Sequence, residues 1–337
     1  MHIVILSART GWQTDELCRA LQERGHTGRV VPYEGLVARL GTSRSAGVGS
    51  RSDPTSQRWL DGPSSRTVPA DLQVRLTSEH TSILDADAVL ARIIPTGSLE
   101  QIIFRVDALH WIEERGVPVM NSPRAPERCV DKFYTTALLQ EAGLPVPETI
   151  VCEGAADAIA AVREMGDVIV KPIFGSLGHG MVRISDPDVA LRVVEPLEQM
   201  RSVFYVQRAV DHGGRDIRVF VVGGRVIGAI ERTAPAGEWR TNVSRGGSVR
   251  PFDLPAAWEQ LALRATVAVG ADYAGVDLLP SRDGALFVLE VNGIPGWKGL
   301  QQATGVDVSG AIIEHLVSRL RAGVAARGVP GPAELPA

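Results

Sequence analysis

Residues 275–293, GVDLLPSRDGALFVLEVNG, constrain the fold more than any other stretch, because they predict both a strand pairing and a site. Asp283-Gly284 is a favoured two-residue hairpin turn, and it lies between two runs of apolar residues. A hairpin with that turn places Asp277 directly opposite Glu290. Asn292 lies two residues further along and shares the face of Glu290, since side chains alternate along a strand. The stretch therefore predicts three oxygen-bearing side chains on one face of an antiparallel sheet.

These three side chains are candidate metal ligands. Two opposed carboxylates are destabilising unless something compensates them, and a bound cation is the simplest compensation. Aspartate, glutamate and asparagine offer the hard oxygens that Mg²⁺ or Mn²⁺ takes. A solvent-facing charge pair is the alternative, and a one-residue slip in register would separate the pair. The intervening apolar residues are expected in the core: Val276, Leu278, Leu289 and Val291.

A second hairpin is predicted within DIRVFVVGGRVIGAIERTA, with Gly223-Gly224 as its turn. That turn places Asp216 opposite Glu231, with Arg218 on the face of Asp216. The group could orient a ribose hydroxyl or a cationic substrate group. A structural ion-pair network on the sheet face is an equally good interpretation.

The first 120 residues predict a small parallel sheet. HIVILSA indicates a buried strand, TDELCRALQERG an amphipathic helix that ends at Gly25, and TGRVVPYE a second strand. A further strand (DADAVLARII) and a helix that ends at Gly116 follow. The turn SARTGWQ after the first strand is not a GxGxxG fingerprint, so no dinucleotide site is predicted there. Residues 41–66 are rich in Ser, Gly and Arg, which indicates a long flexible insertion.

Two further segments are candidates for binding an anion. The strand of DVIVKPIFGSLGHGM ends at Lys171 and is followed by Gly175, Gly178 and Gly180. Such glycines let backbone N–H groups approach a phosphate, although a flexible hairpin loop would show the same pattern, and no Walker A motif is present. In EWRTNVSRGG, residues 238–247, the side chains of Arg240, Asn242 and Arg245 either converge on an anion or form a solvated turn.

Composition limits the class of partner. The chain has 337 residues, a net charge of −4 and a pI of about 6.0, so no overall basic field recruits nucleic acid or an acidic membrane. Its three cysteines show neither metal-ligand nor disulfide spacing, which favours a reducing cytoplasm. The N-terminal apolar run lacks the length and basic flank of a signal peptide, and no membrane span is expected. We therefore expect a cytoplasmic α/β protein whose anion binding is local.

Taken in order, these motifs resemble the ATP-grasp carboxylate–amine ligases, and specifically the RimK-type glutamate ligases. The resemblance covers about residues 120–318, through VIVKPIFGSLGHGM, FYVQRAV, GGRDIRVFVVGGRVIGAIER, EWRTNVSRGG, AGVDLLPSRDGALFVLEVNGIPG and ATGVDVSGAIIEHL. Ligases that add glutamate to tetrahydromethanopterin or to a deazaflavin coenzyme look more similar than those that modify ribosomal proteins.

The resemblance implies an α/β (α+β) fold with a small parallel pre-ATP-grasp domain and a two-lobed ATP-grasp domain built on antiparallel sheets. The implied boundaries are 1–120 for the first domain and 121–322 for the second. Within the second, residues 121–206 form a small lobe and 207–322 a large lobe that carries the metal site. A disordered tail follows at 323–337, and a homodimer or homotetramer is typical of the family.

The resemblance also implies roles for individual residues. Arg240 and Lys171 are the expected catalytic residues, with Asp277, Glu290 and Asn292 as metal ligands. The expected nucleotide-binding residues are Lys132, Lys171, Gly175, Ser176, Gly178, Gly180, Gln207, Arg208, Ala209, Val210, Asp216, Arg240 and Asn242. Arg208 stands where an acidic residue is common in the family, which leaves backbone contacts to adenine as the expected ones. The substrate-facing candidates are Arg92, Thr96, Arg105 and Arg245.

The implied reaction is ATP- and Mg²⁺-dependent amide formation. A small-molecule acid is phosphorylated to an acyl phosphate and then attacked by an amino acid, with L-glutamate as the expected amine and a pterin-like cofactor as the expected acid. Two alternatives are the same chemistry on a protein or peptide carrier, and an ATP-binding regulatory protein without ligase activity. Neither nucleic acid nor a membrane is an expected partner.

Overall fold

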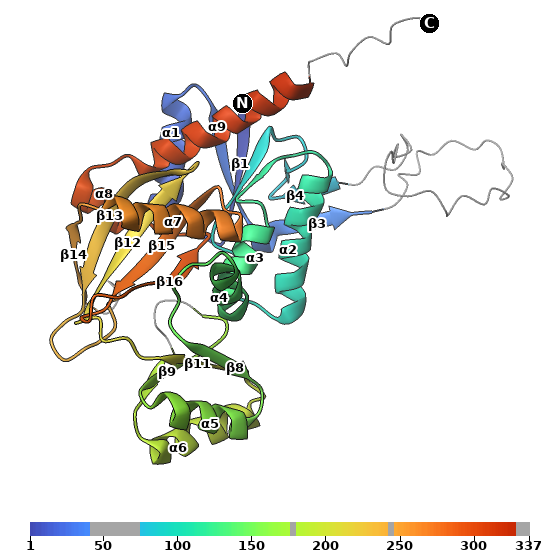
Figure 1. Ribbon diagram of the computed structural model, residues 1–337. Coiled ribbons are helices and arrows are strands. Elements are labelled where there is room, and N and C mark those ends of the chain that lie inside the picture. The colour runs from blue at the N-terminus through green and yellow to red at the C-terminus, as the bar shows by residue number, and fades with distance from the viewer. Residues whose placement is uncertain (41–74, 176–179, 242–245, 328–337) are drawn as a thin grey trace, which may run out of the picture.

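The computed structural model describes residues 1–40, 75–175, 180–241 and 246–327, with side chains to residue 323 (Figure 1). The predicted insertion at 41–66 and the tail beyond residue 327 lie outside the described residues. The helices are α1 (Trp12–Glu23), η1 (Tyr33–Gly35), α2 (Leu99–Glu114), α3 (Arg124–Val130), α4 (Lys132–Glu141), α5 (Ala155–Met165), α6 (Pro187–Gln199), α7 (Ala256–Val269), α8 (Lys298–Thr304) and α9 (Val308–Arg327). The strands are β1 (His2–Ser7), β2 (Thr27–Pro32), β3 (Leu36–Arg39), β4 (Arg75–Ser78), β5 (Thr81–Ser82), β6 (Ala88–Ala91), β7 (Val119–Met120), β8 (Thr149–Cys152), β9 (Val168–Lys171), β10 (Val182–Ile184), β11 (Phe204–Arg208), β12 (Arg215–Val222), β13 (Arg225–Thr233), β14 (Ser248–Pro251), β15 (Tyr273–Pro280) and β16 (Leu286–Asn292).

The N-terminal part is the predicted parallel sheet, in the order β2-β1-β6-β7. Side chains alternate along β1, so Ile3 and Ile5 pack with α1 and α9, whereas Val4 and Leu6 pack with α2 on the other face. Burial on both faces explains the continuous apolar run of β1. A small sheet, β3-β4-β5, extends the second face.

The largest sheet is antiparallel and has the order β14-β13-β12-β15-β16. One face packs against α7 through residues such as Val219, Val276 and Ala265. At one end of the opposite face, Phe220 and Ile230 join the core beneath α1 and α9. The other end of that face carries the charged side chains of the candidate site.

A second antiparallel sheet, β10-β9-β11-β8, lies below the largest sheet in Figure 1. Its outer face packs on α5 and α6 through residues such as Val170 and Val206. The alternate residues, including Lys171 and Gln207, face the largest sheet across a cavity. Two antiparallel sheets facing each other across a cavity, beside a parallel N-terminal sheet, confirm the predicted fold class, while the domain boundaries stay predictions.

Two β-bulges determine which side chains reach the site, and the sequence prediction missed both. In β12–β13 the Gly223-Gly224 turn is as predicted, with φ angles of +56° and +73°. A bulge then shifts the register between Phe220 and Val221. The prediction that Asp216 faces Glu231 is therefore wrong.

The bulge places Arg232 opposite Asp216 and turns Glu231 to the other face of the sheet. There Glu231 pairs with Ile217 across the strands, and its Oε1 accepts a hydrogen bond from Arg250 Nε (2.8 Å).

In β15–β16 the structure departs from the predicted hairpin in two ways, and their effects on the register cancel. The turn is a three-residue loop, because the Ser281 amide bonds the Ala285 carbonyl at 2.8 Å and Gly284 takes φ +92°. A bulge at Leu289 then restores the register, so the predicted pairing of Asp277 with Glu290 is confirmed. Leu289 itself lines the cavity, which corrects its expected place in the core; Val276, Leu278 and Val291 are buried there as predicted.

The segment before Gly143 forms two helices, α3 and α4, and not one. The break lies at Asp131, whose side chain caps α4 by accepting a hydrogen bond from the Tyr134 amide (3.0 Å). Lys132 thus becomes the first residue of α4. Within the described residues, no helix is long and apolar enough to cross a membrane.

Candidate active site

A cavity of ≈ 360 Å³ lies between the two antiparallel sheets. This volume is within the range of small-ligand sites. One wall comes from β9 and β11, and the other from β12, β13, β15 and β16. Seven lysine and arginine side chains line it, against three carboxylates: Lys132, Lys171, Arg208, Arg218, Arg232, Arg240 and Lys298, with Asp216, Asp277 and Glu290.

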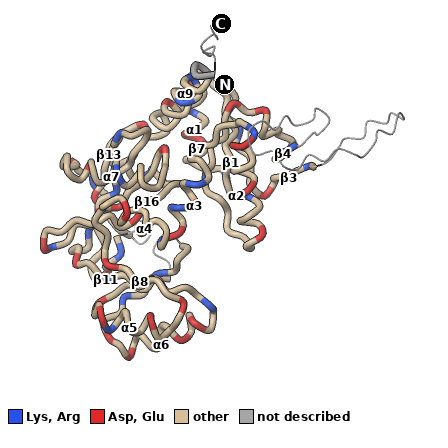
Figure 2. Tube along the Cα trace, turned by 45° about the vertical axis from the view of Figure 1, so that its right-hand side comes forward, with Lys and Arg blue, Asp and Glu red and all other residues tan. Residues whose placement is uncertain are grey.

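The cavity is therefore cationic in a chain of net negative charge. Figure 2 shows Lys/Arg and Asp/Glu segments interspersed over the described chain, so the cationic character is local to the cavity. A cationic pocket with low-dielectric walls concentrates an anion such as a nucleoside triphosphate.

Lys171, at the end of β9, is held at the base of the cavity by a polar network. Its ammonium donates to Gln207 Oε1 at 2.6 Å and lies 5.8 Å from the centre of the Tyr205 ring. Gln207 in turn donates to Thr149 Oγ1 and Tyr205 Oη, both at 3.0 Å. Burial lowers the pKa of Lys171 to about 8, although the negative charge of Glu290 opposes the shift. Lys171 is thus a fixed cation with little solvation of its own.

Lys132 ties the start of α4 to the segment after β9. Its ammonium donates to the carbonyls of Gly175 (3.0 Å) and Ile173 (3.4 Å). Burial lowers its pKa too, partly offset by Glu290 and Asp131. The two lysines that the resemblance singled out therefore line one cavity.

Arg232 is the centre of a buried charge cluster. It donates to Asp216 Oδ1 and Oδ2 (2.7 and 2.6 Å) and contacts Asp277 Oδ2 at 2.9 Å. Arg218 donates to both oxygens of Asp277, each at 2.7 Å. Burial alone would raise the pKa of Asp277, but the two guanidinium groups lower it to about 2. Asp277 is accordingly ionised and already compensated.

Glu290 differs from Asp277, because no described side chain hydrogen-bonds or ion-pairs with its carboxylate. It lies directly opposite Asp277, and Asn292, which accepts a hydrogen bond from the Ile294 amide (3.0 Å), lines the same cavity. In the described part of the chain, no group of three or more His, Cys, Asp or Glu side chains is placed to hold a metal alone.

These residues nevertheless fit Mg²⁺. One or two carboxylates with phosphate oxygens completing the shell is the usual arrangement at a nucleotide site, and Glu290 has free oxygens to offer. Because Arg218 and Arg232 already neutralise Asp277, the two opposed carboxylates do not by themselves require a bound cation. This leaves Glu290 as the principal candidate ligand.

Arg240 lines the cavity, but its guanidinium is turned to a neighbour. It donates to Glu238 Oε1 at 2.9 Å and Oε2 at 2.8 Å. A bidentate pair of this kind holds the side chain in a fixed orientation. The other two polar residues of this stretch, Asn242 and Arg245, lie outside the described residues, as do Ser176 and Gly178.

The described glycines of the loop after β9 have unusual backbone conformations. Gly175 has φ +150° and Gly180 φ +72°. A Cβ on Gly180 would lie 2.9 Å from the Pro172 Cγ, so the loop and Pro172 approach closely. Only glycine fits this approach without strain.

The expected adenine hinge, residues 207–210, lies at the end of β11 beside the cavity. The Arg208 amide donates to the Glu148 carbonyl and the Ala209 amide to the Asp167 carbonyl, each at 2.8 Å. Both N–H groups are therefore already used in hydrogen bonds within the fold. The Arg208 guanidinium pairs with Glu148 (2.7 Å). Gln207, Arg208 and Val210 line the cavity, whereas the lining does not include Ala209.

The structure corrects the predicted substrate contacts of the N-terminal part. Arg92 is 1% exposed and does not line the cavity; it donates to Tyr273 Oη, Gln13 Oε1 and the Pro295 carbonyl, all at 3.0 Å. Arg105 is also buried and donates to the carbonyls of Pro95 (2.8 Å) and Thr96 (3.4 Å). Arg92 therefore links the N-terminal part to β15 and to the segment after β16, and Arg105 holds the segment before α2.

The residues of the cavity wall that sequence reasoning missed include Arg232, Gln13 and Lys298. Arg232 escaped because the bulge in β12–β13 has no marker in the sequence. Lys298 did have a signal, which is the scarcity of lysine in the chain.

Residues 129–316 match the family model of the RimK-like ATP-grasp domain. The chain is 37% identical over 259 residues to a tetrahydromethanopterin:alpha-L-glutamate ligase of Methanosarcina acetivorans, covering 69% of this chain and 80% of the relative. It is 35% identical over 256 residues to a probable alpha-L-glutamate ligase of Trichodesmium erythraeum, covering 74% and 85%. Among solved structures, the ATP-grasp ligase PsnB complexed with a minimal precursor shares the fold, with a TM-score of 0.68, 22% identity and coverage of 94% and 98%.

Proposed function

Because this chain belongs to the RimK-like ATP-grasp family and is an ATP-dependent carboxylate–amine ligase, we propose that it joins L-glutamate to a carboxylate of a small pterin-like acid. The supporting observation is the cationic cavity in which Lys132 and Lys171 face the carboxylate of Glu290. The named activity of the relatives supports glutamate as the amine.

The proposed reaction has two steps. A carboxylate oxygen of the acid attacks the γ-phosphorus of ATP, which breaks the bond to the β-phosphate and releases ADP. The amine then attacks the acyl carbon, phosphate leaves with the bonding electrons, and the ammonium proton is lost, which gives the amide. Charge neutralisation and positioning supply most of the catalysis in such transfers.

Several charged wall residues have a part in this scheme. Lys132 and Lys171 neutralise phosphate oxygens, and Arg240, once released from Glu238, contacts the transferred phosphoryl group. Asp216 is held by Arg232 and Thr241, whose hydroxyl lies 2.6 Å from Asp216 Oδ2, beside the expected ribose. Mg²⁺ held by Glu290, Asn292 and Asp277 would neutralise phosphate charge.

Covalent catalysis by the protein is not needed. Cys129 lines the cavity, but burial, with the charge of Glu290, raises the pKa of its thiol to about 12. A protonated thiol is a poor nucleophile. The acyl group therefore passes directly from phosphate to the amine.

A coupled ADP-release assay tests the proposal. The protein is incubated with ATP, Mg²⁺, L-glutamate and a panel of acids that includes pterins, deazaflavins and peptides, and products are identified by mass spectrometry. A glutamyl adduct of a small acid supports the proposal. ADP release without any amide product would indicate instead an ATP-binding regulatory protein.

A peptide or protein acceptor is the second candidate. It is favoured by the shared fold with PsnB, whose structures contain a precursor peptide. Glutamylation of a peptide in the panel, with all small acids unreactive, would select this candidate.

A further inference from the structure

Lysine is used in this chain only at the cavity. The sequence contains 35 lysine and arginine residues, of which three are lysines: Lys132, Lys171 and Lys298. All three line the same cavity. Lysine presents a compact charge on a flexible stem, and arginine a rigid planar fork, so the two are not interchangeable at a binding site. The presence of all three lysines at one cavity makes Lys298 a candidate for ligand contact.

Lys298 lies away from the two phosphate lysines. It is the first residue of α8, eight positions after Glu290 on the chain, whereas Lys171 lies on β9. In Figure 1, α8 and α1 lie above the largest sheet, and β9 and β11 lie below it. Lys298 therefore lines the cavity from α8, beside α1, whereas Lys171 lines it from β9.

The Lys298 ammonium has no anionic partner within the described chain. Its ordered contact is with the ring of Trp12, whose centre is 5.8 Å from Nζ. A cation–π contact orients an ammonium but leaves its N–H donors available. Beside it, a Cβ on Gly299 would meet no atom within 4 Å, so there is open space next to the charge.

Gln13, on α1, supplies a second set of free donors. Its Oε1 accepts from Arg92 at 3.0 Å, and because arginine only donates, this contact fixes which end of the amide is oxygen. The Gln13 Nε2 is then directed towards Gly296, where a Cβ would lie 2.9 Å from it. No described acceptor takes the hydrogens of this nitrogen.

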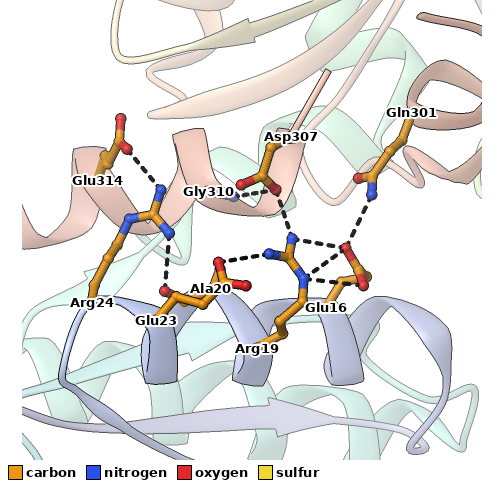
Figure 3. A network of polar contacts seen from close by, with 9 residues as sticks. All are labelled: Glu16, Arg19, Ala20, Glu23, Arg24, Gln301, Asp307, Gly310 and Glu314. Atoms are coloured by element: carbon orange, nitrogen blue, oxygen red, sulfur yellow. Dashed lines mark hydrogen bonds and ion pairs between the residues drawn. The ribbon is translucent and has the colours of Figure 1, made fainter. Parts of the chain in front are cut away.

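The elements that carry these donors are clamped together (Figure 3). Gln301 of α8 donates to Glu16 of α1 at 3.0 Å, and Arg19 pairs with both Glu16 (3.0 Å) and Asp307 (2.8 Å). Hydrogen bonds from Arg19, and then from Gln301, lower the pKa of Glu16, so this carboxylate is ionised at neutral pH. Any single exposed pair contributes little, but together they fix α1 on α8.

We propose that Lys298 and Gln13 form a subsite for a substrate carboxylate that is not the one being activated. Lys298 supplies the charge, Gln13 supplies two neutral N–H donors, and Arg92 is a positioning residue that sets the Gln13 amide. The inference rests on the proposed function, and two sources share the chemistry: a carboxylate of the amino acid, or a second carboxylate of the acid. The subsite thereby selects substrates that carry an additional carboxylate.

Calorimetric titrations test the subsite directly. The full chain, with and without saturating Mg²⁺–AMPPNP, is titrated with L-glutamate and with glutarate, which represent the two sources. Lys298→Gln is expected to weaken at least one probe by tenfold or more while nucleotide affinity stays within about twofold. Arg163→Gln, at an exposed cation on the outer helix α5, is the matched control and is expected to change neither the probe affinity nor the nucleotide affinity.

The outcomes separate this inference from the proposed function. Equal probe affinity in Lys298→Gln and wild type, or no saturable binding of either probe to wild type, overturns the subsite. Failure of wild type to bind Mg²⁺–AMPPNP overturns the proposed function instead, and the nucleotide-free titrations still report on the subsite. The probe that loses affinity identifies the source of the carboxylate.

Amine acetylation gives a second readout that does not depend on a variant folding. With three lysines, labelling is resolved by peptide mass spectrometry at every site. The bound probe is expected to slow acetylation of Lys298 at least threefold, and Mg²⁺–AMPPNP is expected to protect Lys132 and Lys171. The assignment is contradicted if the probe slows acetylation of Lys132 and Lys171 while Lys298 is acetylated as fast as in the free protein.

Discussion

Lys171 is expected to take up a proton when nucleotide binds at mildly alkaline pH. Burial lowers its pKa from an ordinary 10.5 to about 8, which corresponds to about 3 kcal/mol against the charged form. At pH 8.5 only about a quarter of the free protein therefore carries the charge. A triphosphate beside the ammonium favours the charged form, so binding should draw in up to about three quarters of a proton per site.

The sign of the linked effect on stability follows from the same pKa. Between pH 8 and 10.5 the unfolded chain binds more protons at this lysine than the native protein does, so the contribution of Lys171 to stability rises with pH across that window. Nucleotide affinity changes in the opposite direction. It is greatest below pH 8 and falls as pH rises, because protonating Lys171 then costs free energy.

Calorimetry of Mg²⁺–AMPPNP binding in buffers of different ionisation enthalpy measures the proton uptake. Lys171→Arg is the matched control, since arginine stays charged throughout and should abolish uptake while keeping the cation. Uptake near zero at pH 8.5 in wild type, or equal uptake in Lys171→Arg, would refute the reasoning. It would show that the Gln207 network leaves the ammonium fully protonated.

Three further predictions concern the charged wall. Glu290→Ala should abolish Mg²⁺-dependent ADP release with unchanged circular dichroism, and near-normal turnover would remove Glu290 from the metal site. Arg240→Ala should lower kcat by about 10²–10³-fold, as for loss of a transition-state charge contact, whereas a change confined to the KM of one substrate would make it a binding residue. Arg232→Leu leaves buried Asp277 with one cation fewer and should destabilise the fold by about 3–5 kcal/mol, seen as a lower unfolding temperature, while Arg282→Gln, in a pair with Asp211 whose side chains are 70% and 68% exposed, should change it little.

The sequence alone predicted those elements whose structure depends on local periodicity and on turn residues. The apolar run of β1 and the amphipathic α1 follow from periodicity alone. The left-handed glycines at 223 and 224 mark the turn between β12 and β13. The resemblance located Lys132 and Lys171, which periodicity cannot do, because nothing near either residue in the sequence distinguishes it from a solvated lysine.

The strand-pairing predictions depend on register, and the register at one pair depends on every residue between that pair and the turn. A bulge adds one residue on one strand, so every pair beyond it is displaced, and its position is set by tertiary packing that no local pattern records. In β12–β13 one missed bulge exchanged Glu231 for Arg232, which converted a predicted carboxylate pair into a salt bridge with Asp216.

In β15–β16 a missed loop residue and a missed bulge cancelled, so the facing of Asp277 and Glu290 was predicted correctly from a turn that does not exist. The two bulges also supply the charge balance of the site. By bringing Arg232 to the cavity face, the first bulge compensates Asp277, and by keeping Glu290 opposite, the second leaves one carboxylate free for a cation. Arg232→Leu, which removes this compensation, should therefore raise the pKa of the buried Asp277 carboxyl, which NMR titration of Asp277 would detect as protonation well above pH 2.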